Sequence, residues 1–239
     1  NLTSSKYSPY LFEIRKRILA TLAVFAVATV VGFVFYERII KFLIDILSLK
    51  GINLVFTSPF QFISLAISCG LACGLVFTFP LLIYQVLSFL RPALRVKEYK
   101  MVVGSLPYSI TLFLIGFSFG VLVMKWQIQL FLTKSLSLGI GNILDISRLL
   151  STVLLISVFM GLAFQFPIII LLLARIGVIK HSQLVKQRPW VYLGSALFTI
   201  LLPLDSILAD VLLALPLITL FEITLILNRI FERRKVAYV

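Results

Sequence analysis

Arg91-Pro-Ala-Leu-Arg-Val-Lys-Glu-Tyr-Lys100 is the segment around which the chain is organised, because long apolar runs flank it on both sides. Its four cations surround a single carboxylate, Glu98. One interpretation is that Glu98 moderates its neighbours through surface ion pairs, each worth about 0 to 1 kcal/mol. The other is that it binds a cationic ligand at a membrane surface. The segment alone favours the first interpretation, and the rest of the chain reverses that preference.

The composition places the chain in the membrane. Hydrophobic residues make up 61% of its 239 positions, and charged residues only 13%. A soluble domain carries about 25% charged residues. We therefore expect an integral membrane protein, folded as one all-α domain over residues 1–239.

Six apolar runs predict six transmembrane helices. The first, Ile18–Tyr36, has 19 residues, or about 28 Å as a helix, which matches a hydrocarbon core of about 30 Å. The other runs cover residues 60–90, 101–124, 149–174, 190–202 and 211–227. The last two have only 13 and 17 residues, which implies local bilayer thinning or cover by a partner.

The connections carry their own signals. Residues 37–58 contain apolar residues at helical spacing, which predicts a helix lying on the membrane surface. These are Ile39, Phe42, Leu43, Ile46 and Leu47. Ser58-Pro59 is typical of a helix start. Residues 125–148 are predicted to form an outer loop.

The distribution of cations predicts the orientation. Sixteen of the 22 lysines and arginines lie in the N-terminal segment, the second and fourth connections and the C-terminal segment. The positive-inside rule then places both termini and Glu98 in the cytoplasm. The basic excess marks topology and contact with anionic lipid. It does not indicate nucleic-acid binding, because the cations are spread over four short segments.

A few polar residues stand near or inside the predicted spans. Glu13 precedes the first span and could simply pair with Arg17 one turn later. Gln165 and Glu222 lie within spans, where polar side chains are costly and are functional candidates by default. Gln165 could instead join two helices by a hydrogen bond, and Glu222 could reach the inner surface near Arg229.

The outer turn before the last span is flanked by Asp205 and Asp210, one of which could cap the next helix. No sequence signature of an enzyme, a metal site or a nucleotide-binding loop is present, so we expect neither catalysis nor a cofactor.

Motifs along nearly the whole chain resemble those of the TatC family, the core of the twin-arginine protein translocase. The family's N-terminal motif His-Leu-x-Glu-Leu-Arg-x-Arg-Leu corresponds to Tyr10-Leu-Phe-Glu-Ile-Arg-Lys-Arg-Ile18. The most specific match runs from Tyr84 to Glu98. Further matches are Ser58-Pro59-Phe60, Pro80, Phe164-x-x-Pro167, Arg188-Pro189, Pro216 and Phe221-Glu222.

The chain departs from the family pattern at several positions. Tyr10 replaces a histidine, and Gln165 stands where the family usually has an intramembrane glutamate. Asp205 is one residue early relative to the family's Pro-x-Asp, and Asp210 stands where a glutamine is common. Gln165 keeps the capacity for hydrogen bonds but carries no charge.

The resemblance implies a concave bundle that receives Arg-Arg signal peptides of folded cargo at the cytoplasmic face. The implied binding residues are Glu13, Arg15, Arg17, Gln85, Phe89 and Glu98. A carboxylate suits a guanidinium because it accepts two parallel hydrogen bonds. We expect Glu13 and Glu98 to face one groove and each to bind one arginine.

The resemblance also implies partners and a location. Single-span proteins of the TatA/TatB type would dock on the two short final spans, and other copies of the chain would join the complex. Gln165 would contribute to a polar patch near the bilayer midplane. The protein would lie in the cytoplasmic membrane of a prokaryote, or an organellar equivalent, and export would draw on the proton-motive force.

Two alternatives remain at this stage. A secondary transporter or channel for a small solute would need repeated halves and paired ionisable groups near the midplane. We find no obvious internal repeat, and Glu222 has no apparent buried cation to pair with. A purely structural scaffold would leave Glu13 and Glu98 replaceable.

Overall fold

The computed structural model of the chain describes residues 4–49, 53–90, 99–100, 103–138, 143–176, 179, 181–203 and 206–236. Its elements, in chain order, are α1 (Ser4–Val34), α2 (Tyr36–Ile46), β1 (Asn53–Val55), α3 (Gln61–Leu90), α5 (Leu106–Ser137), β2 (Ile143–Asp145), α6 (Ile146–Ala163), α7 (Phe166–Ile176), α8 (His181–Lys186), α9 (Arg188–Ile200) and α10 (Ile207–Val236). The all-α prediction is confirmed, apart from two short strands.

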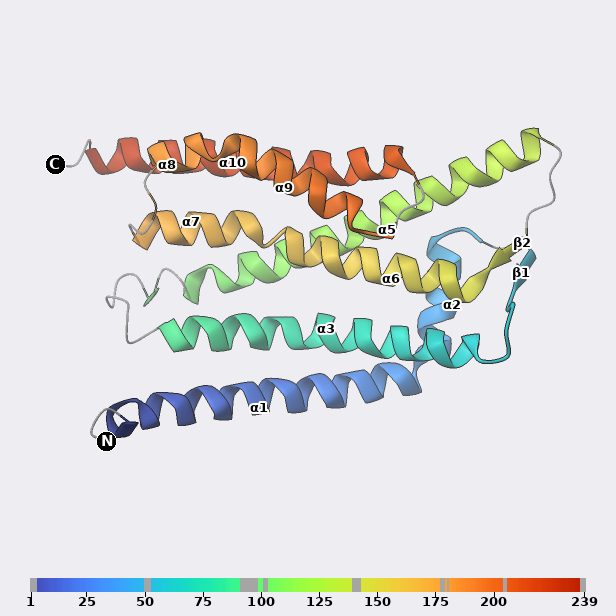
Figure 1. Cartoon of the computed structure of the whole chain (residues 1–239), viewed down its shortest axis with the longest axis horizontal. Coiled ribbons are helices and arrows are strands. Elements are labelled where there is room, and N and C mark those ends of the chain that lie inside the picture. The colour runs from blue at the N-terminus through green and yellow to red at the C-terminus, as the bar shows by residue number, and fades with distance from the viewer. Residues whose placement is uncertain are drawn as a thin grey trace.

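The long helices lie side by side along the molecule (Figure 1). α1 and α3 occupy one edge, α9 and α10 the opposite edge, and α6 and α7 run between them while α5 crosses obliquely. The start of α1 and the end of α10 lie at the same end of the molecule, and β1 and β2 lie at the other end. We call these the terminal end and the strand end.

Five helical stretches among the described residues are long and apolar enough to cross a membrane. They are Arg15–Val34, Gln61–Gln85, Leu106–Ser137, Ile146–Ala174 and Ile207–Ile230. The remaining predicted span corresponds to α9, whose 13 residues extend only about 20 Å. The shortness of the fifth span is therefore confirmed, while the count of six crossings and the N-in/C-in orientation stay predictions.

Two predicted boundaries are wrong. The outer loop was expected to begin at residue 125, but α5 continues to Ser137, because Lys125 and Lys134 are good helix formers whose stems can lie along apolar surface. The sixth span is also not short, since its apolar stretch has 24 residues. Asp210 lies in the first turn of α10, where an acid suits the helix dipole and does not end the helix.

Glycines let neighbouring helices approach closely. A Cβ on Gly70 of α3 would lie 2.8 Å from the Thr29 carbonyl oxygen of α1, and a Cβ on Gly120 of α5 would lie 2.7 Å from the Ser157 Cα of α6. Both glycines belong to a Gly-x-x-x-Gly pattern, with Gly74 and Gly116 respectively. Small residues at such spacing are typical of membrane helix interfaces.

The strand end is closed by α2 and the strand pair. α2 forms where a surface helix was predicted, with Leu43 and the C-cap residue Leu47 buried and Phe42 63% exposed. β1 pairs with β2 in parallel, placing Asn53 opposite Ile143 and Val55 opposite Asp145. This pair was not predicted, because three-residue strands carry no measurable hydrophobic alternation.

We expect Gly120→Ala to lower the stability of the chain in detergent by about 1 to 3 kcal/mol, because the added methyl would press on the backbone of α6. Thermal unfolding followed by tryptophan fluorescence measures this loss. Gly194→Ala in α9 is the matched control, since nothing lies within 4 Å of its added Cβ. An unchanged Tm for Gly120→Ala would contradict the close-packing interpretation.

Candidate functional site

Two of the predicted site residues meet where α1 packs against α3. Arg17 Nη1 donates a hydrogen bond to the backbone oxygen of Gln85 at 3.2 Å. Thr21 Oγ1 donates to Gln85 Oε1 at 2.7 Å and lies 2.9 Å from the Arg17 carbonyl oxygen. These contacts tie the first half of α1 to the last turns of α3.

The other residues predicted at this end are placed only in part. Glu13 lies on α1 one turn before Arg17, Arg15 is exposed, and Phe89 lies in the last turn of α3. The side chains of Glu13 and Phe89, and the whole of Glu98, lie outside the described part of the chain. The expected shared groove for the two carboxylates therefore stays a prediction.

Gln165 is buried at the break between α6 and α7, where residues 164 and 165 form a turn. Ser109 Oγ of α5 donates to Gln165 Oε1, and Gln165 Nε2 donates to the Ser109 carbonyl at 3.1 Å. Nε2 also donates to the Gly161 carbonyl at 3.5 Å. The backbone N–H of Gln165 bonds to the Leu162 carbonyl and leaves the Gly161 carbonyl to the side chain. The side chain thus joins two helices and covers a carbonyl that the break releases.

Glu222 has a cationic partner, which is Arg188 and is partly exposed. Arg188 Nη2 at the start of α9 lies 2.9 Å from Glu222 Oε2, and the Tyr192 hydroxyl donates to Glu222 Oε1. The Arg188 side chain is 44% exposed, so the ion pair is partly solvated. Sequence reasoning missed it because Arg188 was assigned to a cytoplasmic connection and Arg229 was the nearer cation in the chain.

Of the two outer aspartates, Asp210 lies within the described residues. Asp210 lies inside the first turn of α10, so it is not the residue that caps the helix from outside. Its Oδ1 is buried without a hydrogen-bond partner among the described residues. Asp205 lies outside the described residues.

Asp145, which sequence reasoning missed, organises the strand end. Its side chain caps α6 by accepting from the Arg148 amide at 3.0 Å, and it also accepts from Thr57 and Gln61 at 2.7 Å each. Partial burial acts to raise the pKa of Asp145, but these hydrogen bonds outweigh it and lower the pKa. An aspartate directly before an apolar run is a helix-start signal that could have identified it.

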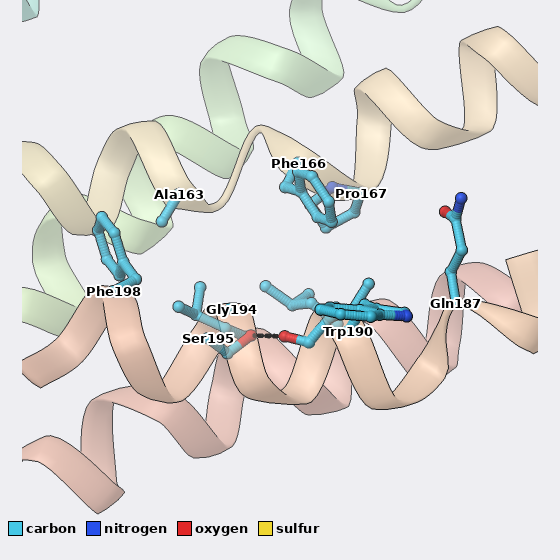
Figure 2. Close-up of a pocket in the computed structure, with 11 residues that line it drawn as sticks. Ala163, Phe166, Pro167, Gln187, Trp190, Gly194, Ser195 and Phe198 are labelled. Carbon is cyan, nitrogen blue, oxygen red and sulfur yellow. Dashed lines mark hydrogen bonds between the residues drawn. The ribbon is translucent and has the colours of Figure 1, made fainter.

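An apolar cavity of about 400 Å³ lies between the α6–α7 break and α9. Figure 2 shows Trp190 of α9 along one side of it, facing Phe166 and Pro167 of α7, with Phe198 towards one end and Gln187 towards the other. α9 also carries a stripe of exposed apolar residues, which begins at the cavity with Trp190 and continues with Leu193, Leu197 and Ile200. This spacing gives α9 one continuous apolar face that the described residues of the chain leave uncovered.

The chain matches one protein family over most of its length. Residues 9–216 match the family model described as Sec-independent protein translocase protein (TatC). The chain is 29% identical to TatCy of Bacillus subtilis, covering 94% of this chain and 89% of that protein. It is 30% identical to TatC of Escherichia coli K12, covering 93% of this chain and 87% of that protein.

A solved structure agrees with the sequence matches. The crystal structure of the twin-arginine translocase receptor TatC in DDM superposes with a TM-score of 0.81 at 28% sequence identity. The alignment covers 91% of this chain and 98% of that structure. These matches do not favour the alternative of a small-solute transporter or channel.

The lowered pKa of Asp145 predicts a pH dependence of stability. Its carboxylate contributes in full above the ordinary aspartate pKa of about 4, and the contribution is lost as the pH falls through the lowered value. We expect the Tm in detergent of the parent to fall more steeply below about pH 4 than that of Asp145→Asn. Glu37→Gln, an exposed change on α2, should follow the parent, and equal slopes for parent and Asp145→Asn would refute the cap.

Proposed function

This chain belongs to the TatC family of Sec-independent protein translocase proteins, and from that premise we propose that it is the membrane core and signal-peptide receptor of a twin-arginine translocase. It binds Arg-Arg signal peptides of folded cargo at the terminal end, on the cytoplasmic face of a prokaryotic inner membrane. Export draws on the proton-motive force. No residue is assigned to that coupling.

The contact of Arg17 with Gln85 is the observation that supports this site best. It fixes the rotation of α1 against the end of α3, directly before the segment that carries Glu98. Residues four apart share a helix face, so Glu13 shares its face of α1 with Arg17.

Two carboxylates at this position suit a pair of guanidinium groups. Each bidentate contact, partly shielded from water, is worth roughly 1.5 to 3 kcal/mol. Arg15 and the cations of residues 91–100 repel basic segments whose two guanidinium groups are not aligned with the two carboxylates. Lysine presents a point charge and not a fork, so an Arg-Arg pair is preferred over Lys-Lys.

The apolar face of α9 supports the docking of a single-span partner of the TatA/TatB type. α9 extends about 20 Å against a hydrocarbon core of about 30 Å. A partner helix laid on Trp190, Leu193 and Leu197 would cover both the exposed stripe and the mismatch in length. The neutral polar patch that we propose at Gln165 lies at the α6–α7 break, where the side chain bonds to Ser109 of α5.

We expect Glu13→Ala and Glu98→Ala each to weaken binding of an Arg-Arg signal peptide by about tenfold or more, because each leaves one guanidinium without its carboxylate. Fluorescence anisotropy with the detergent-solubilised chain measures this. Glu37→Ala on α2, at the strand end, is the matched control. The receptor role is refuted if both variants hold the peptide as tightly as the parent, or if a Lys-Lys peptide binds equally well.

Single cysteines placed at Leu193 and Leu197 of α9 should crosslink to a TatB-like helix in native membranes. The background replaces Cys69 and Cys73 with alanine, and gel mobility reports the adduct. Val27, 65% exposed on α1 at the opposite edge, is the control and should give little adduct. Equal or stronger crosslinking at Val27 would assign the docking surface to α1 instead.

A further inference from the structure

A second cavity, of about 720 Å³, lies at the strand end between the last turns of α5, the start of α6 and the turn from α9 to α10. It is distinct from the cavity beside α9, and none of the residues assigned to signal recognition lines it. Its lining combines charged, polar and apolar side chains.

Two cations line this cavity from different helices. Lys134 comes from the last turn of α5, and Arg148 from the first turn of α6. Both are exposed, and neither side chain has an ion-pair partner among the residues that the structure describes. Their two positive charges are therefore available to a ligand.

The acid that lines the same cavity does not neutralise them. Asp145 accepts hydrogen bonds from Thr57, Gln61 and the backbone amide of Arg148, but not from the Arg148 side chain. With both cations and this carboxylate counted, the lining carries one net positive charge. The N-terminus of α10, beside Ser206 and Ala209, adds the positive end of a helix dipole. Asp210, in the first turn of that helix, is not part of the lining.

The rest of the lining is apolar or aromatic. Trp126 and Phe131 are 42% and 54% exposed, and Ile128 and Leu149 lie beside them. Gln127 also lines the cavity, and its Oε1 is buried without a partner among the described residues. The cavity thus offers two cations and an apolar wall.

We propose that this cavity binds the headgroup of an anionic phospholipid, with its phosphodiester on Lys134 and Arg148 and its acyl chains along Trp126 and Phe131. A phosphodiester carries one negative charge, which balances the lining. Phosphatidylglycerol, whose headgroup carries only this single negative charge, suits the lining. This is a discrete site at the strand end, separate from the diffuse attraction of the basic segments at the terminal end for anionic lipid.

The lipid is favoured over a free anion because of the apolar wall. A hydrated phosphate ion would use only the two cations, in an exposed setting where such pairs are worth about 1 kcal/mol or less each. Acyl chains add burial of apolar surface on the aromatic side chains and hold the headgroup at the depth of the cations.

The test measures lipid binding to the full chain in detergent by native mass spectrometry. Phosphatidylglycerol, phosphatidylcholine and inorganic phosphate are the three probes. We expect phosphatidylglycerol to bind the parent more tightly than phosphatidylcholine, and Lys134→Gln/Arg148→Gln to weaken it by about tenfold. Lys41→Gln, an exposed cation on α2 outside the lining, is the control and should bind like the parent.

A photoactivatable phosphatidylglycerol then locates the site, with label expected on the segment from Trp126 to Phe131. The proposal is overturned if the double variant, with an unchanged Tm in lipid-free detergent, binds phosphatidylglycerol like the parent. It is also overturned if inorganic phosphate competes at equal concentration, which would indicate a site for a free anion. Label confined to the terminal end would overturn it as well.

Discussion

The close approach of helix backbones is the constraint on which this molecule depends. Lipid offers no hydrophobic drive between apolar helices, so van der Waals contact between their surfaces must hold them together. Gly70 brings α3 to the backbone of α1, and Gly120 brings α5 to the backbone of α6. The hydrogen bonds from Arg17 and Thr21 to Gln85 form only because α1 and α3 are already in contact along their length.

Polar groups inside the bundle are satisfied by partners from other helices. Gln165 uses both ends of its amide, since Oε1 accepts from Ser109 and Nε2 donates to two carbonyls. A neutral side chain is sufficient for this role, which explains how the chain tolerates an amide where the family usually has a carboxylate. Glu222 pairs with Arg188 and accepts a hydrogen bond from Tyr192, both from α9.

Hydropathy predicted where the helices lie because lipid demands long apolar runs with satisfied backbones. It located α2 as well, since Leu43 and Leu47 recur at helical spacing on its buried face. It misjudged the ends of α5 and α10, where Lys125 and Asp210 are charged but compatible with a helix. A charged residue therefore marks the end of a membrane span only where its side chain can reach neither water nor a helix terminus.

The contacts of the site were harder to predict than its members. Arg17 and Gln85 were named from the motifs, but their mutual contact, the pairing of Glu222 with Arg188 and the cap at Asp145 all join segments far apart in the chain. Ser109 and Gln165, for instance, are 56 positions apart. Such pairs depend on which helix faces which, and a single sequence carries no direct signal for that.

The parallel pairing of β1 with β2 has a consequence for biogenesis. Two long helices, α3 and α5, separate the strands in the chain, so β1 is synthesised long before its partner leaves the ribosome. Until β2 has been synthesised, the backbone groups of Asn53–Val55 have no strand to bond, and Thr57 and Gln61 lack the carboxylate of Asp145. Contacts of such long sequence separation form late. Pairing of the strands therefore requires that α1, α3 and α5, which all precede β2 in the chain, have been synthesised, and a nascent chain arrested before that point exposes an unpaired strand edge to proteases.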